Sequence, residues 1–211
     1  IVSFEPAGYY DWSDTPTAAV FRPPTAAVAP IDDERIAALD DRPLIYATLG
    51  TEFYDPVLMG SILEGLADGD WNVVATTGPG GDPLEVDPRR AGVVVLPWID
   101  HAAIVDRAAL VISHGGAGTV VGSLVRGVPT VCLPSGADQF HHARRVVELG
   151  VGASLPTDRR SPRHVREAVD EVVGTPTYRI AARRLAAETA LLPDLDQAVA
   201  LLERIAAEPW T

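Results

Sequence analysis

The apolar positions of the chain fall into short continuous runs that alternate with segments of helical periodicity. The Val-, Ile- and Leu-rich runs predict strands over residues 43–49, 71–77, 91–96, 109–113 and 129–133, with a candidate sixth at 152–155. The periodic segments predict helices over residues 57–67, 102–108, 117–126, 138–149, 162–173, 178–191 and 194–207. Strands that are apolar throughout are typical of a parallel sheet covered on both faces. We therefore expect an α/β fold, a Rossmann-like doubly wound parallel sheet of about six strands with C-terminal helices.

The beginning of the chain lacks this alternation. Residues 1–4 form an apolar run of strand type, whereas residues 5–42 hold many prolines and no long periodic segment. We expect residues 1–41 to be an interdomain segment from an N-terminal half that precedes this chain. The chain would then be a cloned fragment or one of two chains. Residues 42–211 are expected to form one Rossmann-like domain with a helical tail.

Charge and composition narrow the class of partner. The 211 residues carry a formal net charge of −12, and every basic residue among Lys and Arg is an arginine. Such an acidic chain argues against binding to nucleic acid or an anionic membrane, because both need clustered positive charge. The single cysteine, Cys132, lies in a predicted buried strand and cannot form an internal disulfide. No apolar run reaches transmembrane length and no signal peptide is visible, so we expect a soluble cytoplasmic protein.

Glycines and polar side chains gather where predicted strands end. The segment His114-Gly-Gly-Ala-Gly-Thr119 follows the strand at 109–113 and opens a helix. A helix N-terminus offers free N–H groups and a partial positive charge, and glycines let a ligand approach the backbone. Further motifs at 50–51, 77–78, 97–101 and 134–139 also follow strands. Ligands of doubly wound sheets bind beyond these carboxyl ends, so the sequence predicts a phosphate-binding site there.

Other phosphate and metal sites fit the residues less well. The dinucleotide fingerprint GxGxxG is absent after the first strand of the domain, and the glycine loop 78–81 lacks the Lys-Ser/Thr of a P-loop. His141 and His142 have no third ligand at a metal-site spacing. The DxD pairs that begin at Asp68 and Asp194 fall at helix boundaries, away from the phosphate motifs. We therefore expect no cofactor and no metal requirement.

Residues 91–156 resemble the nucleotide-sugar-binding half of GT-B glycosyltransferases of the UDP-glycosyltransferase type, a class that includes bacterial enzymes that decorate antibiotics. The motifs that carry this resemblance, in matching order and spacing, are Trp98-Ile-Asp-His101, His114-Gly-Gly-Ala-Gly-Thr119, Gly127-Val-Pro129 and Pro134-Ser-Gly-Ala-Asp-Gln139. They cover about a third of the chain. The segment 49–51 and the helical tail extend the resemblance to most of the rest, and the ordered set is highly specific.

The resemblance implies a role for each matched residue. Trp98 would stack on the base, and the backbone of Ile99 would hydrogen-bond the base edge. Asp138 and Gln139 would bind hydroxyl groups of the sugar. The residues implied to hold the diphosphate are Thr51, His114, Gly116, Gly118 and Thr119. Because negative charge grows on the departing nucleoside diphosphate, contacts there would stabilise the transition state.

Three positions depart from the family pattern. Asp100 replaces the proline that often follows the Trp-Ile pair, and His142 replaces the asparagine that usually follows the Asp-Gln pair. Gly122 stands where the family commonly has a glutamate that binds the ribose hydroxyls. A carboxylate there is most useful when the ribose has its 2′-hydroxyl. Its absence favours a TDP-sugar donor over a UDP-sugar donor.

The resemblance implies an inverting glycosyltransferase that acts by direct displacement on a small hydrophobic natural-product acceptor. The family's catalytic base is a histidine of the N-terminal half, and none of the five histidines here matches it, so no catalytic residue is assigned in this chain. We expect the chain alone to bind donor and to transfer little or no sugar. Two alternatives stay open: a lipid, sterol or cell-wall-type GT-B enzyme, and a non-catalytic sugar-nucleotide-binding subunit.

The last predicted helix has an apolar face. In the family this tail reaches back to the N-terminal half. Without that half, exposure of the face would promote homodimers. Its residues are Leu195, Val199, Leu202 and Ile205.

Overall fold

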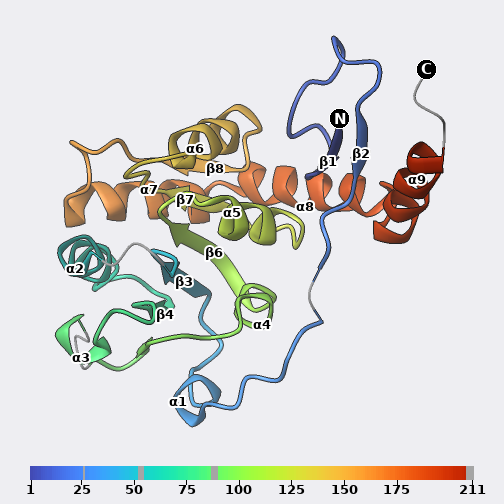
Figure 1. The fold of residues 1–211 in the computed structure, drawn as a ribbon. Helices are drawn as coiled ribbons and strands as arrows, with labels where there is room; N and C mark the ends of the chain where they lie inside the picture. The colour runs from blue at the N-terminus through green and yellow to red at the C-terminus, as the bar shows by residue number, and fades with distance from the viewer. Residues whose placement is uncertain (26, 52–54, 87–89, 208–211) are drawn as a thin grey trace.

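The computed structural model describes residues 1–25, 27–51, 55–86 and 90–207. Its centre is a six-stranded sheet in the order β5-β4-β3-β6-β7-β8, in which every neighbouring pair is parallel (Figure 1). The strands are β3 (Leu44–Thr48), β4 (Asn72–Thr76), β5 (Val93–Leu96), β6 (Ala108–Ser113), β7 (Thr130–Cys132) and β8 (Gly152–Ser154). The six predicted strands and the doubly wound order are confirmed.

Helices connect these strands and continue after them. Those that match a predicted segment are α2 (Pro56–Gly65), α4 (His101–Val105), α5 (Ala117–Leu124), α6 (Gln139–Glu148), α7 (Pro162–Gly174), α8 (Pro176–Ala190) and α9 (Leu195–Ala207). Side-chain caps fix two of the starts, because Asp55 accepts a hydrogen bond from Leu58 N and Asp100 accepts one from Ala103 N. Asp100 therefore has a structural reason to stand where the family often has proline.

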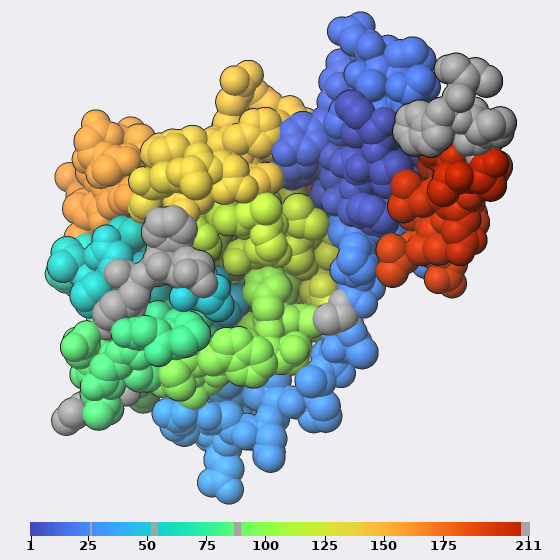
Figure 2. All heavy atoms as spheres, viewed as in Figure 1, coloured from blue at the N-terminus to red at the C-terminus, as the bar shows by residue number. Residues whose placement is uncertain are grey.

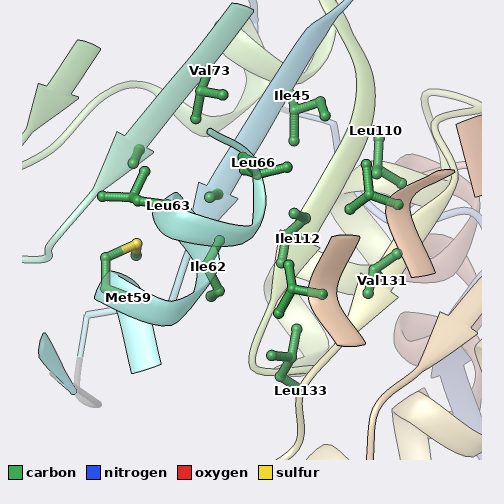
Figure 3. Close-up of a cluster of buried hydrophobic side chains, with 14 of the residues drawn as sticks. Ile45, Met59, Ile62, Leu63, Leu66, Val73, Leu110, Ile112, Val131 and Leu133 are labelled. Atoms are coloured by element: carbon green, nitrogen blue, oxygen red, sulfur yellow. The ribbon is translucent and has the colours of Figure 1, made fainter. Parts of the chain in front are cut away.

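The two faces of the sheet carry separate apolar cores because successive residues of a strand point to opposite sides. Ile45 and Ala47 of β3 belong to the core beneath α2 and α7, and Leu44 and Tyr46 belong to the core beneath α4. Figure 3 shows part of the first of these cores, with side chains of α2 beside β3 and β4 and further side chains from β6 and the end of β7. The labelled residues are Met59, Ile62, Leu63, Leu66, Ile45, Val73, Leu110, Ile112, Val131 and Leu133.

The first 41 residues contain regular structure that was not predicted. β1 (Val2–Phe4) confirms the strand predicted within residues 1–4, and it pairs in parallel with β2 (Ala19–Phe21), which was not predicted; α1 (Glu34–Ala37), which follows, was not predicted either. Another short helix, α3 (Pro83–Val86), was also missed. β2, α1 and α3 are short and lie in segments rich in proline and turn residues, where no apolar run or helical period marks them. That residues 1–41 belong between two domains stays a prediction.

The last helix, α9, stands apart from the body of the molecule beside the N-terminal strands (Figures 1 and 2). The four apolar residues named above on its face are each between 45% and 49% exposed. Self-association through this face stays a prediction. Among the described residues, no helix combines the length and apolar character needed to cross a membrane.

The packing of α2 predicts a specific loss of stability. Ile62 is fully buried between α2 and the sheet, whereas Val57 of the same helix is 79% exposed. Ile62→Ala should lower the free energy of unfolding by about 2–5 kcal/mol, because it leaves a cavity in the core. Val57→Ala, the matched control, should change it by less than about 0.5 kcal/mol. Urea unfolding followed by circular dichroism measures both, and equal effects would contradict this packing.

Candidate functional site

A cavity of about 410 Å³ opens at the carboxyl ends of the central strands. It lies where the strand order reverses between β3 and β6, which is the ligand position of doubly wound sheets. Its size falls within the range of small-molecule sites. The lining residues come from four strand ends and two helix starts: Tyr46, Thr48, Gly50, Thr51, Thr76, Gly78, Pro97, Trp98, Ile99, His101, His114, Gly116, Ala117, Gly118 and Thr119.

The structure therefore brings together the residues expected at the base and the diphosphate. Trp98 and Ile99 follow β5, Thr51 follows β3, and His114, Gly116, Gly118 and Thr119 lie at the turn from β6 into α5. These segments are far apart in the sequence and meet only because parallel strands end at one edge. Their individual roles stay predictions.

The N-terminus of α5 points its backbone donors toward this cavity. Gly115, between β6 and α5, has a φ of +85°, a value that favours glycine. The turn at Gly115 leads directly into α5. Gly116 is the N-cap and makes no side-chain capping bond. The first N–H groups of α5 therefore remain available to a ligand, and the helix dipole adds partial positive charge. This arrangement is suited to binding phosphate oxygens.

The imidazole of His114 lies between the backbones of two loops. A Cβ atom on Gly50 would be 2.7 Å from His114 Cε1, and a Cβ atom on Gly116 would be 2.5 Å from His114 Nε2. Side chains at either glycine would displace the ring. Burial lowers the pKa of His114, and the charge of Asp138 opposes this in part. The ring is consequently neutral at pH 7 and presents one N–H donor beside α5.

Polar side chains that the sequence did not single out form the floor of the cavity. Tyr46 Oη lies 3.2 Å from Thr76 Oγ1, which donates to Thr48 Oγ1 at 2.9 Å. Thr48 Oγ1 also accepts a hydrogen bond from Gly50 N. A signal was present in the sequence, because each threonine is the last residue of an otherwise largely apolar strand. These hydrogen bonds hold the backbone of Gly50 at the edge of the cavity.

The mouth of the cavity is aromatic. Trp98 is 62% exposed and lies at the carboxyl end of β5, so its ring is not a core residue. Ile99, the next residue, is buried and belongs to the same apolar cluster as Tyr46 and Ile104. An exposed indole at a cleft offers a flat face to a planar base.

His101, which lines the cavity, packs against Gly122 of α5. A Cβ atom on Gly122 would lie 2.8 Å from His101 Nε2, so the imidazole fills the space where a side chain at position 122 would begin. The ring also packs against Tyr46, with centroids 5.8 Å apart. Burial and the nearby Arg126 lower the pKa of His101, and Asp100 opposes them, which keeps the ring neutral at pH 7.

Asp138 and Gln139 do not line this cavity but stand beside its glycine loop. A Cβ atom on Gly115 would be 3.1 Å from the carbonyl oxygen of Gln139. Gln139 is buried, and its Oε1 accepts hydrogen bonds from Ser135 N and Gly136 N. A direct contact with a sugar would have to come from its amide NH₂ group. The Asp138 side chain is 63% exposed and is therefore accessible to a ligand.

The acidic pairs considered as metal ligands have other surroundings. Asp194 accepts a hydrogen bond from Gln197 N and pairs with Arg22 at 3.4 Å. Asp68 and Asp70 lie between α2 and β4, at the amino edge of the sheet. Within the described ranges, no group of three or more His, Cys, Asp or Glu side chains is arranged to hold a metal ion. The absence of a metal requirement stays a prediction.

Three comparisons with known proteins place this geometry in a family. Residues 61–205 match the family described as "Erythromycin biosynthesis protein CIII-like, C-terminal domain". The chain is 35% identical over 203 residues to 4'-demethylrebeccamycin synthase of Lentzea aerocolonigenes, covering 94% of this chain and 48% of that protein. It is 34% identical over 172 residues to 10-deoxymethynolide desosaminyltransferase of Streptomyces venezuelae, covering 79% and 40%.

The fold has solved counterparts as well. The calicheamicin glycosyltransferase CalG4 superposes with a TM-score of 0.82 at 26% identity, over 97% of this chain and 54% of that chain. The chain thus spans about half the length of these relatives, and its sheet and flanking helices match the C-terminal half of GT-B glycosyltransferases. The chain belongs to the erythromycin biosynthesis protein CIII-like C-terminal domain family, a family of antibiotic and natural-product glycosyltransferases.

Proposed function

We propose that this chain is the donor-binding half of an inverting glycosyltransferase that moves a sugar from a nucleoside-diphosphate sugar to a small hydrophobic natural product. One observation carries the proposal. A neutral imidazole and an uncapped helix N-terminus converge on a cavity at the switch point, with an exposed tryptophan at its mouth. A diphosphate between a planar base and a sugar has the shape and charge for which these groups are suited.

The site would stabilise the departing nucleoside diphosphate. As the glycosidic bond breaks, negative charge accumulates on the diphosphate oxygens. His114 and the first N–H groups of α5 would bind that charge more strongly in the transition state than in the ground state. No arginine or lysine is among the described residues that line the cavity. Backbone dipoles and neutral donors would therefore carry most of this stabilisation in a chain of net charge −12.

We further propose that TDP-sugars are preferred over UDP-sugars. No side chain at position 122 can reach a ribose 2′-hydroxyl, and the packing of His101 against Gly122 closes the space that such a side chain would need. The structure of the glycosyltransferase VinC, 23% identical to this chain, was determined in complex with DTDP, which supports this choice of donor.

The acceptor site and the catalytic base would lie in the remaining half of the protein. The relatives named above are about twice as long as the stretch that this chain matches. Among the described residues that line the cavity, the two histidines have other surroundings or roles: His114 is proposed above to bind the diphosphate, and His101 packs against Gly122 and Tyr46. The chain alone would therefore bind donor without transferring sugar.

Diphosphate binding by His114 can be tested directly. His114→Ala should weaken the binding of TDP by about tenfold to a hundredfold, since it removes a hydrogen bond to a charged group. His164→Ala on α7, which removes a histidine outside the cavity, should leave the affinity unchanged. Isothermal titration calorimetry measures both. Equal affinities for TDP in the wild type and His114→Ala would refute the assignment.

The proposed preference for TDP over UDP can be tested separately. The wild type should bind TDP more tightly than UDP. The double variant His101→Ala, Gly122→Glu, which makes room for a carboxylate at position 122, should shift the ratio of the two affinities toward UDP by about tenfold. His101→Ala alone is the control and should not produce this shift. Similar affinities of the wild type for TDP and UDP would remove the basis of the preference.

If the catalytic base lies in the other half of the protein, this chain alone should not transfer sugar. Incubated with TDP-glucose and a small aromatic alcohol, it should yield no glycoside, because no base is positioned to activate the acceptor. Mass spectrometry of the mixture detects the product. Sustained turnover by this chain alone would contradict the proposal that the base lies elsewhere.

A further inference from the structure

A chain of three polar side chains connects the N-terminal segment to the loop that holds Asp138. Tyr9 is 1% exposed, and its Oη lies 2.8 Å from Nδ1 of His142 on α6. The other ring nitrogen of His142, Nε2, lies 3.3 Å from Oδ2 of Asp138. Residues 133 positions apart in the sequence are thus joined through one imidazole.

Physical chemistry fixes the direction of both hydrogen bonds. A carboxylate can only accept, so Nε2 of His142 must carry the proton that is donated to Asp138. Burial lowers the pKa of His142 despite the opposing charge of Asp138, so the ring is neutral and has a single N–H. Nδ1 must then accept from the hydroxyl of Tyr9. Burial also raises the pKa of Tyr9, which keeps that hydroxyl protonated. The Nε2–H tautomer of His142 therefore satisfies both hydrogen bonds.

Tyr9 is fixed by packing and by hydrogen bonds to its backbone. Its ring belongs to the apolar cluster that includes residues of α5, α6, α8 and β7, among them Val120 and Cys132. Arg145 donates to the carbonyl oxygens of Tyr9 and Gly8, and it forms an ion pair with Glu148. Figure 2 shows the N-terminal segment, in blue, lying directly against the yellow surface of α6. These contacts fix the position of the Tyr9 hydroxyl.

Tyr10 secures the neighbouring turn and supplies a comparison. Its ring stacks on His141 with centroids 5.2 Å apart, and neither residue takes part in the polar chain. Burial and the charge of Glu5 raise the pKa of Tyr10, so its hydroxyl is protonated as well. Tyr9 and Tyr10 are adjacent, but only Tyr9 hydrogen-bonds His142, whereas Tyr10 is half-buried and stacks on His141.

The bond from His142 determines where the carboxylate of Asp138 can point. Asp138 is the N-cap of α6, a position at which aspartate ordinarily accepts from the N–H groups of the first turn. Here it makes no such bond, and its backbone has φ −76° and ψ −6° rather than an extended conformation. With Oδ2 engaged by His142, the exposed part of the carboxylate is presented beside the glycine loop of His114, whose pKa it influences.

We propose that Tyr9 and His142 are positioning residues that orient the carboxylate of Asp138 toward the sugar hydroxyls of the donor. This inference rests on the proposed function and adds to it, because the N-terminal segment then contributes to recognition of the sugar without touching it. A carboxylate fixed in this way accepts hydrogen bonds from hydroxyl groups with little loss of side-chain entropy.

The test separates binding of the sugar from binding of the nucleotide. Calorimetry gives the affinities of the wild type and of Tyr9→Phe for TDP and for TDP-glucose. The ratio of the affinity for TDP-glucose to the affinity for TDP should fall by about threefold to tenfold in Tyr9→Phe. The affinity for TDP alone should stay within about twofold. Tyr10→Phe, the matched control, should leave both affinities unchanged. An unchanged ratio in Tyr9→Phe overturns the inference, and so does an equal loss of both affinities.

A double variant tests whether Tyr9 acts through Asp138. Asp138→Ala should lower the same ratio, and adding Tyr9→Phe should cause no further loss, because the two changes remove one interaction. Losses that add independently would overturn the inference. Failure of the wild type to bind TDP or UDP would count instead against the proposed function.

Nuclear magnetic resonance of the imidazole nitrogens supplies a readout that needs no ligand. His142 should be the Nε2–H tautomer in the wild type, in Tyr10→Phe and in Tyr9→Phe, because Asp138 still accepts from Nε2, and it should be a mixture of tautomers in Asp138→Ala. The Nδ1–H tautomer in the wild type would overturn the inference.

Discussion

Between β3 and β6 the two halves of the sheet extend in opposite directions, so the connections that leave these strands diverge and open a crevice at the carboxyl edge. Every described residue that lines the cavity depends on this reversal. The strands that end there carry Thr48 and Thr76 as a polar floor, and β6 turns directly into α5. A single topological feature therefore sets the position of the helix N-terminus, the imidazole and the tryptophan relative to one another.

Glycines at the site serve chiefly to make room for rings. Gly50 and Gly116 leave space for the imidazole of His114, and Gly122 leaves space for that of His101. Both imidazoles have lowered pKa values because they are buried, and both are neutral donors or acceptors at pH 7. In the proposed function, oriented dipoles and neutral donors would hold the diphosphate, without a cluster of fixed positive charge.

The N-terminal segment is part of the packed structure of this chain. Tyr9 and Ile36 are each at most 1% exposed, and they belong to apolar clusters on the same face of the sheet. Tyr9 in addition contacts the helix that begins next to Asp138. Removal of this segment would leave both clusters open to water, and it would free His142 and Asp138 to adopt other orientations.

The sequence by itself determined the class of fold, the six strands of the large sheet and seven of the helices, because each of those elements is long enough to show a period or is bounded by turn residues. The motifs of the sequence also resemble those of a known family, and that resemblance implied nine candidate site residues. Only the tertiary structure revealed β1 pairing with β2, the contact of His101 with Gly122 and the chain from Tyr9 to Asp138. These join residues far apart in the sequence, and no local pattern records which distant side chains will meet when the chain packs.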